Sequence, residues 1–214
     1  MTSVTARLAS RLVRFQAYAG RVLPSPRATP LATAMVLLLL GAALVLHLLF
    51  PENIDEVVDW TSTNLHNLAR HPVAAMLASA FVVPTGLIPE LVLVAVGFAL
   101  LERSIGTLRT AIVALSGHVL ATLLTEYGAP LLVSSAPDRP DVGVSYAMFA
   151  VLAAAALRLT GRARVLAVLA VGAAVLIPFA IELDMNTTGH LLSAVIGPLT
   201  MAPLLRRPGP ALQS

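Results

Sequence analysis

Long apolar runs separated by short polar connections occupy most of the chain. The first run, 31–50, has 20 residues and contains one ionisable residue, His47. A helix of this length is about 30 Å long, which matches the hydrocarbon core of a bilayer. Comparable runs follow at 86–101, 108–127, 144–157, 165–181 and 189–205. The pattern predicts an all-α membrane protein with six transmembrane helices.

These runs divide the chain into residues 1–30, a membrane domain over 31–207 and a tail over 208–214. In the first part, arginines recur at helical spacing beside an apolar stripe: Arg7, Arg11, Arg14 and Arg21. This spacing predicts a basic amphipathic helix on an anionic membrane surface, and a disordered basic tail that only sets topology is the alternative.

The connection between the first two runs also has an amphipathic pattern. Asn53 and Glu56 have the spacing of a capping box. Apolar residues follow at Ile54, Val57, Trp60, Leu65 and Leu68, which predicts a helix lying in the outer interface, where tryptophan is favoured. Residues 73–83 are apolar but too short to span a bilayer. They are expected either to dip into the leaflet or to lead into the second span.

Composition agrees with lipid as the solvent, because 57% of the residues are hydrophobic and 12% are charged. The isoelectric point near 10.2 does not indicate nucleic acid binding, since the basic residues are scattered and form no patch. The absence of cysteine excludes disulfides and thiolate metal sites. His66 and His71 lack the spacing of a zinc site. No metal or cofactor is therefore expected.

The arginines predict which side of the membrane each loop faces. Six spans with a cytoplasmic N-terminus leave Arg70 and Arg139 outside. The other twelve fall inside: Arg7, Arg11, Arg14, Arg21, Arg27, Arg103, Arg109, Arg158, Arg162, Arg164, Arg206 and Arg207. This bias predicts that both termini are cytoplasmic. Arginine without lysine, in a chain rich in alanine and leucine, suggests a GC-rich bacterial genome and hence the bacterial inner membrane.

Ionisable and nucleophilic groups within membrane spans are candidates for function. They are His47, Glu90, His118, Glu126, Ser145, His190 and Ser193. Ser145 precedes Arg158 by 13 residues, or ~20 Å of helix, and His190 precedes Arg206 by 16 residues, or ~24 Å. The two groups are therefore expected at similar depths below the outer surface, as a candidate nucleophile and base.

Taken alone, Ser145 is more simply interpreted as a helix cap, and His190 as an interfacial residue. Small residues spaced four apart, Gly143 with Ala147 and Ser193 with Gly197, predict a close approach of the fourth and sixth spans. Such an approach is what would bring the serine and the histidine together.

Several motifs over residues 31–205 resemble those of the rhomboid intramembrane serine proteases. The family has G-x-S at the start of its fourth helix, and this chain has Gly143-Val144-Ser145. The family's A-H-x-x-G-x-x-x-G is similar to the stretch from Gly189-His190 through Ser193 to Gly197. The G-x-x-L-E-x-x-x-G-x-x-R motif matches the segment that contains Glu102, and Phe149 resembles a tyrosine that packs on the catalytic histidine.

The resemblance implies that Ser145 attacks a carbonyl of a membrane-protein substrate and that His190 acts as base and then as acid. It also implies a six-helix bundle and an oxyanion held partly by backbone N–H groups. The family's H-x-x-x-N is replaced by Gly86 and Glu90, so a side-chain oxyanion donor is missing, at an expected loss of ~10²–10³ in rate. The glycine that follows the family's serine is Tyr146 here.

Two other functions remain open at this point. A catalytically inactive rhomboid-like protein would bind membrane clients. A small proton-coupled transporter would use Glu90, His118 and Glu126, although no internal repeat supports it. His118 is expected to donate to an oxyanion or, preferably, to join Glu90 or Glu126 in a structural polar network. Glu102 is expected to pair with Arg103 or Arg109.

Overall fold

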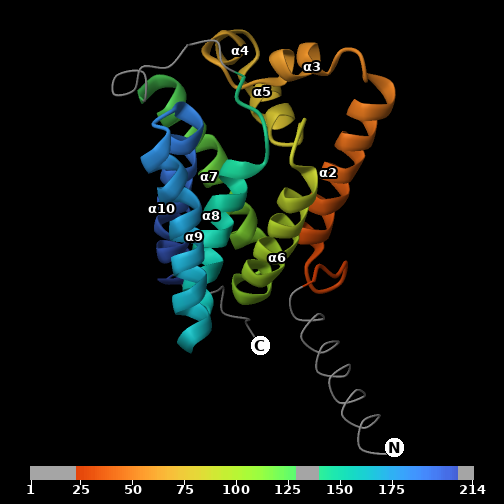
Figure 1. Cartoon of the computed structure of the whole chain (residues 1–214). Coiled ribbons are helices and arrows are strands. Elements are labelled where there is room, and N and C mark those ends of the chain that lie inside the picture. Colours follow the sequence, from red (N-terminus) through yellow and green to blue (C-terminus); the bar gives the residue numbers. More distant parts are fainter. Residues whose placement is uncertain (1–22, 129–139, 207–214) are drawn as a thin grey trace, which may run out of the picture.

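The computed structural model describes residues 23–128 and 140–206, and within these ranges every regular element is a helix (Figure 1). Each predicted span corresponds to one long helix: α2 (Pro30–Leu49), α6 (Leu87–Ile105), α7 (Thr107–Gly128), α8 (Ser145–Arg158), α9 (Gly161–Ile181) and α10 (Met185–Arg206). Four of them, α2, α7, α9 and α10, are long and apolar enough to cross a membrane. The all-α membrane class is confirmed. The predictions for residues 1–22 and for 207–214, which include the basic helix and the tail, lie outside the described residues.

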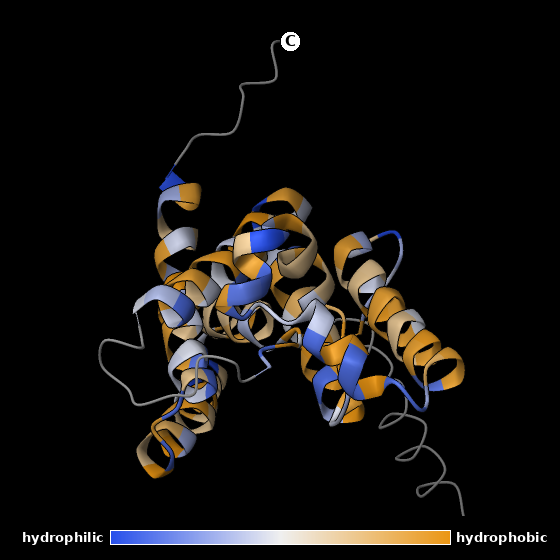
Figure 2. Cartoon of the chain, turned by 90° about the horizontal axis from the view of Figure 1, so that it is seen from above, coloured by the Kyte–Doolittle hydropathy of each residue, from blue (hydrophilic) through white to orange (hydrophobic). Residues whose placement is uncertain are grey.

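Helix α8 lies at the centre of the bundle and packs against α6, α7, α9 and α10. Its alanine-rich sequence allows neighbouring backbones to approach closely. Helix α2 packs on α6 at one edge, while α9 touches only α8 and α10 closely and buries Val175 alone. Hydrophobic residues, orange in Figure 2, run along the outward sides of these helices, as expected for surfaces that face lipid.

Glu102 joins three helices at one end of the bundle. Its carboxylate accepts hydrogen bonds from the backbone N–H groups of Leu31 (3.0 Å) and Ala32 (2.9 Å) in the first turn of α2. It also accepts from the hydroxyl of Thr107, at 2.7 Å, where α7 begins. Arg103, next to it in sequence, donates to the carbonyl of Leu23 at 2.9 Å. The structural role expected for Glu102 is observed, but with helix N–H groups as its main partners.

Three short helices cap the opposite end: α3 (Ile54–Thr61), α4 (Leu65–Arg70) and α5 (Pro72–Ser79), seen at the top of Figure 1. The prediction of a single interfacial helix over 54–68 is wrong, because the helix is interrupted at residues 62–64. Asn64 caps α4 by accepting from the N–H of Asn67 (2.9 Å). The N–H of Thr63 is bonded outside the helix, to the carbonyl of Asp141 at 3.0 Å.

The start of α3 and the segment from α5 to α6 also differ from what the sequence predicts. The side-chain amide of Asn53 donates to Glu56 at 3.2 Å, but neither side chain caps the other residue's backbone. The segment 73–83 forms the separate helix α5 followed by a turn, and α6 begins after Gly86, whose φ of 72° favours glycine.

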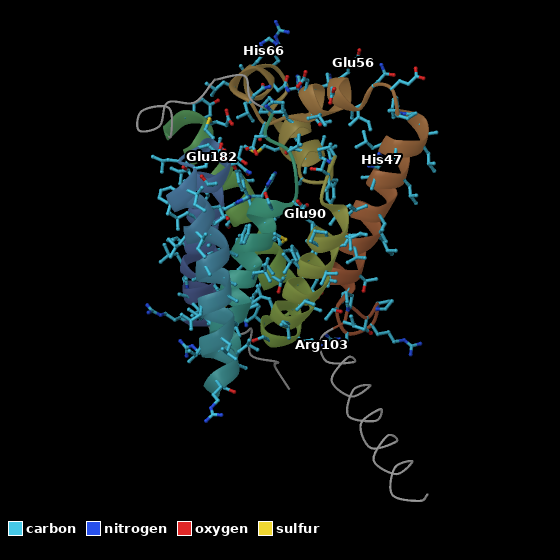
Figure 3. The ribbon with its side chains drawn as sticks, in the orientation of Figure 1. His47, Glu56, His66, Glu90, Arg103 and Glu182 are labelled. Atoms are coloured by element: carbon cyan, nitrogen blue, oxygen red, sulfur yellow. The ribbon has the colours of Figure 1, made fainter. Side chains whose placement is uncertain are left out.

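Charge is distributed unequally between the two ends. Arginines lie in the terminal turns of the long helices at one end, as Arg103 does in Figure 3, whereas Glu56, His66 and Glu182 lie toward the other. Arg70, in the outer cap, is the exception among the described arginines. This polarity agrees with the arginine pattern in the sequence, and the cytoplasmic placement of the arginine-rich end stays a prediction.

Candidate active site

Ser145 is the first residue of α8, and a tight turn leads into it. Gly143 has a φ of 123°, which only glycine adopts readily, and its N–H donates to the carbonyl of Ser79 at 2.7 Å. Gly143 therefore shapes the turn and makes no helix contact with α10, so the small-residue pair predicted with Ala147 does not form. Val144, fully buried, anchors the serine's position.

His190 lies in the second turn of α10, directly beside the start of α8. A side chain at Gly189 would overlap the ring of Tyr146, and one at Gly197 would overlap the backbone of Ala150. The predicted close approach at Gly197 is therefore confirmed, since α8 and α10 meet with no room for a Cβ atom. In sequence, Ser145 directly precedes Tyr146, and His190 directly follows Gly189.

Two aromatic rings of α8 pack on the imidazole ring of His190. Phe149 lies with its ring centroid 4.7 Å away at an interplanar angle of 48°, which agrees with the packing role predicted for it. Tyr146 meets the imidazole edge-on, at 5.7 Å and 80°. Ser193, fully buried one turn further along, donates its hydroxyl to the carbonyl of His190 at 2.9 Å. The sequence analysis did not predict this role for Tyr146. The one feature that could have indicated it is that an aromatic residue stands where the family motif has glycine.

No hydrogen bond joins the side chains of Ser145 and His190 in the described residues. The Nε2 atom of His190 is buried and has no hydrogen-bond partner among the described residues. Asp184, in the turn before α10, acts electrostatically on the ring. Catalytic hydrogen bonds are often long in the absence of substrate. The absence of a hydrogen bond between the two side chains therefore fits an active as well as an inactive site.

The remaining candidate polar residues do not form the predicted network. His118 donates from Nε2 to the carbonyl of Met76 at 2.8 Å, which ties α7 to α5. No hydrogen bond links His118, Glu90 or Glu126 to one another in residues 23–128. Buried Oε2 of Glu90 has no partner in the described part of the chain. His118 thus holds two helices together, which is a structural role reached through a different partner from the one expected.

Asp141 connects the cap formed by α3, α4 and α5, called the outer cap after its predicted side of the membrane, to the start of α8. Its N–H donates to the hydroxyl of Ser62 at 2.7 Å, and the hydroxyl of Thr63 donates to its carboxylate at 3.2 Å. Burial raises the pKa of Asp141 from 3.8 to about 6, although the nearby hydroxyls of Thr63 and Tyr146 oppose the shift. The sequence did not single out Asp141, because its partners at 62 and 63 are far away in the chain.

Two hollows adjoin this region. A polar cavity of about 210 Å³ lies at the outer end, lined by Glu126, Asp141, Asn186 and neighbouring residues. An apolar groove of about 280 Å³ runs between α6 and α9 with α8 as its floor, and Phe149 is among its lining residues. Because Phe149 also packs on His190, its ring lies between the groove and the histidine.

No group of three or more histidine, aspartate or glutamate residues that could hold a metal ion occurs in residues 23–128 and 140–206.

Comparison with known protein families shows to which family the chain belongs. The model of a family described as rhomboid-like protein matches residues 26–211. The chain belongs to this family. No curated protein and no solved structure matches this rhomboid-like chain. The family match covers both Ser145 and His190 and all six long helices.

Proposed function

We propose that this rhomboid-like protein is an intramembrane serine endopeptidase in which Ser145 is the nucleophile and His190 the general base. The observation that carries the proposal is the closely packed contact between Tyr146 and Gly189. Ser145 and His190 each adjoin that contact in sequence, one residue away from it, at the first residue of α8 and in the second turn of α10, which supports their pairing.

In the proposed reaction the hydroxyl of Ser145 attacks a peptide carbonyl while Nε2 of His190 takes the hydroxyl proton. The protonated imidazole then gives that proton to the departing amine, and a water molecule hydrolyses the resulting ester. The first N–H groups of α8 have no acceptor within the helix, and the helix dipole is positive at this end. They are suited to stabilise the oxyanion that forms beside Ser145.

The substrate we propose is a transmembrane helix of another membrane protein. The groove between α6 and α9 is apolar along its length, with Leu93 and Val96 on one wall and Ala170 and Val171 on the other. A lipid-facing helix can enter it from the bilayer, and the groove continues to Phe149 beneath the imidazole. The site lies near the end opposite the arginines, which we assign to the outer face of a bacterial inner membrane with both termini in the cytoplasm.

A catalytically inactive protein that binds membrane clients is the second candidate. Two observations favour it: Glu90 replaces the expected oxyanion donor, and Nε2 of His190 is without a hydrogen-bond partner in the described chain. The proton-coupled transporter has no such support, because hydrogen bonds do not connect Glu90, His118 and Glu126 in the described helices.

The proposal is tested by reconstituting the purified protein in liposomes with a panel of single-span membrane proteins. Mass spectrometry would locate any new terminus, with Ser145→Ala and His190→Ala as test variants and Ser116→Ala as a matched control on α7. Cleavage near one end of the substrate span is expected, lost in both test variants and kept in the control. Equal binding of panel proteins by wild type and Ser145→Ala, with no cleavage by either, would establish the client-binding function instead.

A further inference from the structure

Tyr146 is a large buried side chain at a position directly beside the proposed nucleophile. It is 3% exposed, and its ring meets His190 edge-on, while Phe149, one turn later on the same helix, covers another side of the imidazole. The two aromatic rings hold the imidazole from different directions. An imidazole in contact with only one of them would have more freedom to turn about its side-chain bonds.

The sizes of residues 146 and 189 are matched to each other. A Cβ atom built on Gly189 would overlap the Cζ and hydroxyl oxygen of Tyr146, so the tyrosine ring occupies the space that any larger residue at 189 would need. The rhomboid motifs quoted above have the opposite arrangement, with glycine after the serine and alanine before the histidine. This chain has the large Tyr146 where the motif has glycine, and the smaller Gly189 where the motif has alanine.

The hydroxyl end of Tyr146 faces the outer cap. It lies beside the carboxylate of Asp141 and the hydroxyl of Thr125, although its geometry falls short of a well-formed hydrogen bond. Asp141 is itself fixed by Ser62 and Thr63 between α3 and α4. A continuous series of contacts therefore runs from the outer cap through Asp141 and Tyr146 to His190.

We propose that Tyr146 is a positioning residue for His190, filling the space opened by Gly189, and that Asp141 holds its hydroxyl end. In Ser-His-Asp enzymes a carboxylate orients the imidazole. Here the packing of Tyr146 and Phe149 orients the imidazole of His190, and Asp141 links Tyr146 to the outer cap. The catalytic meaning of this role rests on the proposed hydrolase function, whereas the packing itself does not.

The test uses the full-length protein in detergent with ¹⁵N-labelled histidine. The chain has five histidines, so the ring signals of His190 can be assigned by comparison with His190→Gln. Tyr146→Ala is expected to shift and broaden the His190 signals, and Tyr146→Phe to shift them less, because the ring contact remains. Tyr127→Ala, which removes a tyrosine that is 58% exposed at the end of α7, is the matched control and should leave them unchanged.

A double-mutant cycle tests the size match. Gly189→Ala is expected to lower the melting temperature in the wild-type background and to have little effect when Tyr146 is already alanine. Labelling by a fluorophosphonate probe should slow roughly twofold to tenfold in Tyr146→Ala, the range that an aromatic pair contributes.

Unchanged His190 signals in Tyr146→Ala would overturn the proposal. An equal loss of stability from Gly189→Ala in both backgrounds would overturn the size match. A wild type that does not react with the probe would refute the hydrolase function alone, since the ring signals and the melting temperatures still decide whether Tyr146 positions His190.

Discussion

Replacement of Glu102 tests how the bundle is held together at its arginine-rich end. The side chain is 3% exposed, and its two carboxylate oxygens accept from Leu31, Ala32 and Thr107 at 3.0, 2.9 and 2.7 Å. Two of these donors are orphan N–H groups of the first turn of α2, which have no partner within their own helix. Glu102→Ala removes all three acceptors at once and leaves the helix start without its counter-charge.

The size of the effect follows from these contacts. A hydrogen bond to a charged group contributes about 1.5–3 kcal/mol, and a carboxylate at a helix N-terminus adds about 0.3–1 kcal/mol. Bonds that share one carboxylate are not additive, and hydrogen bonds in membrane proteins are often weaker, so we expect Glu102→Ala to destabilise the fold by about 3 kcal/mol. Glu102→Gln keeps one acceptor oxygen but turns an amide N–H group toward a donor, so about half of that loss is expected.

The measurement is reversible unfolding in mixed micelles at increasing SDS fraction, followed by circular dichroism. Glu52→Ala is the matched control, because Glu52 is exposed beyond the end of α2 and should change the free energy of unfolding by less than about 0.5 kcal/mol. A loss below about 1 kcal/mol in Glu102→Ala would refute the structural role assigned to these hydrogen bonds.

Three further predictions follow from other contacts. Gly197→Ala should destabilise the protein by roughly 2 kcal/mol or more in the same unfolding assay, because its Cβ would overlap Ala150, whereas Gly172→Ala, with open space around it, should be neutral or stabilising by up to about 1 kcal/mol. Because folding raises the pKa of Asp141 to about 6, the folded protein binds this proton more tightly than the unfolded chain, and stability should fall by about 1–3 kcal/mol as pH rises from about 4 to about 6. Asp141→Asn should remove that slope, and an unaltered slope would contradict the assignment. His118→Phe should cost about 1–2 kcal/mol, since the carbonyl of Met76 on α5 keeps only the longer hydrogen bond from the Ser79 hydroxyl (3.4 Å). Unchanged hydrogen exchange of α5 would contradict the tie.

The positions of the long helices could be predicted because apolar length alone determines them. Each of the six runs corresponds to a helix, and the boundaries shift by a few residues, as for α6, which continues to Ile105. The cap at the outer end could not be predicted in the same way. Its break at 62–64 depends on hydrogen bonds with Asp141, almost eighty residues away, and no local pattern reports such a partner.

The residues of the candidate site likewise divide into those that could be predicted from the sequence and those that could not. The role of Phe149 could be predicted because the motif resemblance implies that it packs on His190, and that ring contact is observed. Motif spacing and helix depth predict Ser145 and His190 as a pair, and this pairing stays a prediction. The partners of Glu102 and His118 could not, because both bind backbone groups, which every residue carries. Tyr146 was missed for another reason. Its role depends on Gly189, so neither residue is informative without the other.

The most direct measurement of the proposed dyad is the rate at which a fluorophosphonate labels the folded protein, with the labelled residue identified by mass spectrometry. A nucleophile activated by His190 predicts a single adduct on Ser145 that is lost in both Ser145→Ala and His190→Ala, while thermal melts show that each variant remains folded. Labelling that persists in His190→Ala, or a well-folded wild type that never reacts, would contradict the dyad.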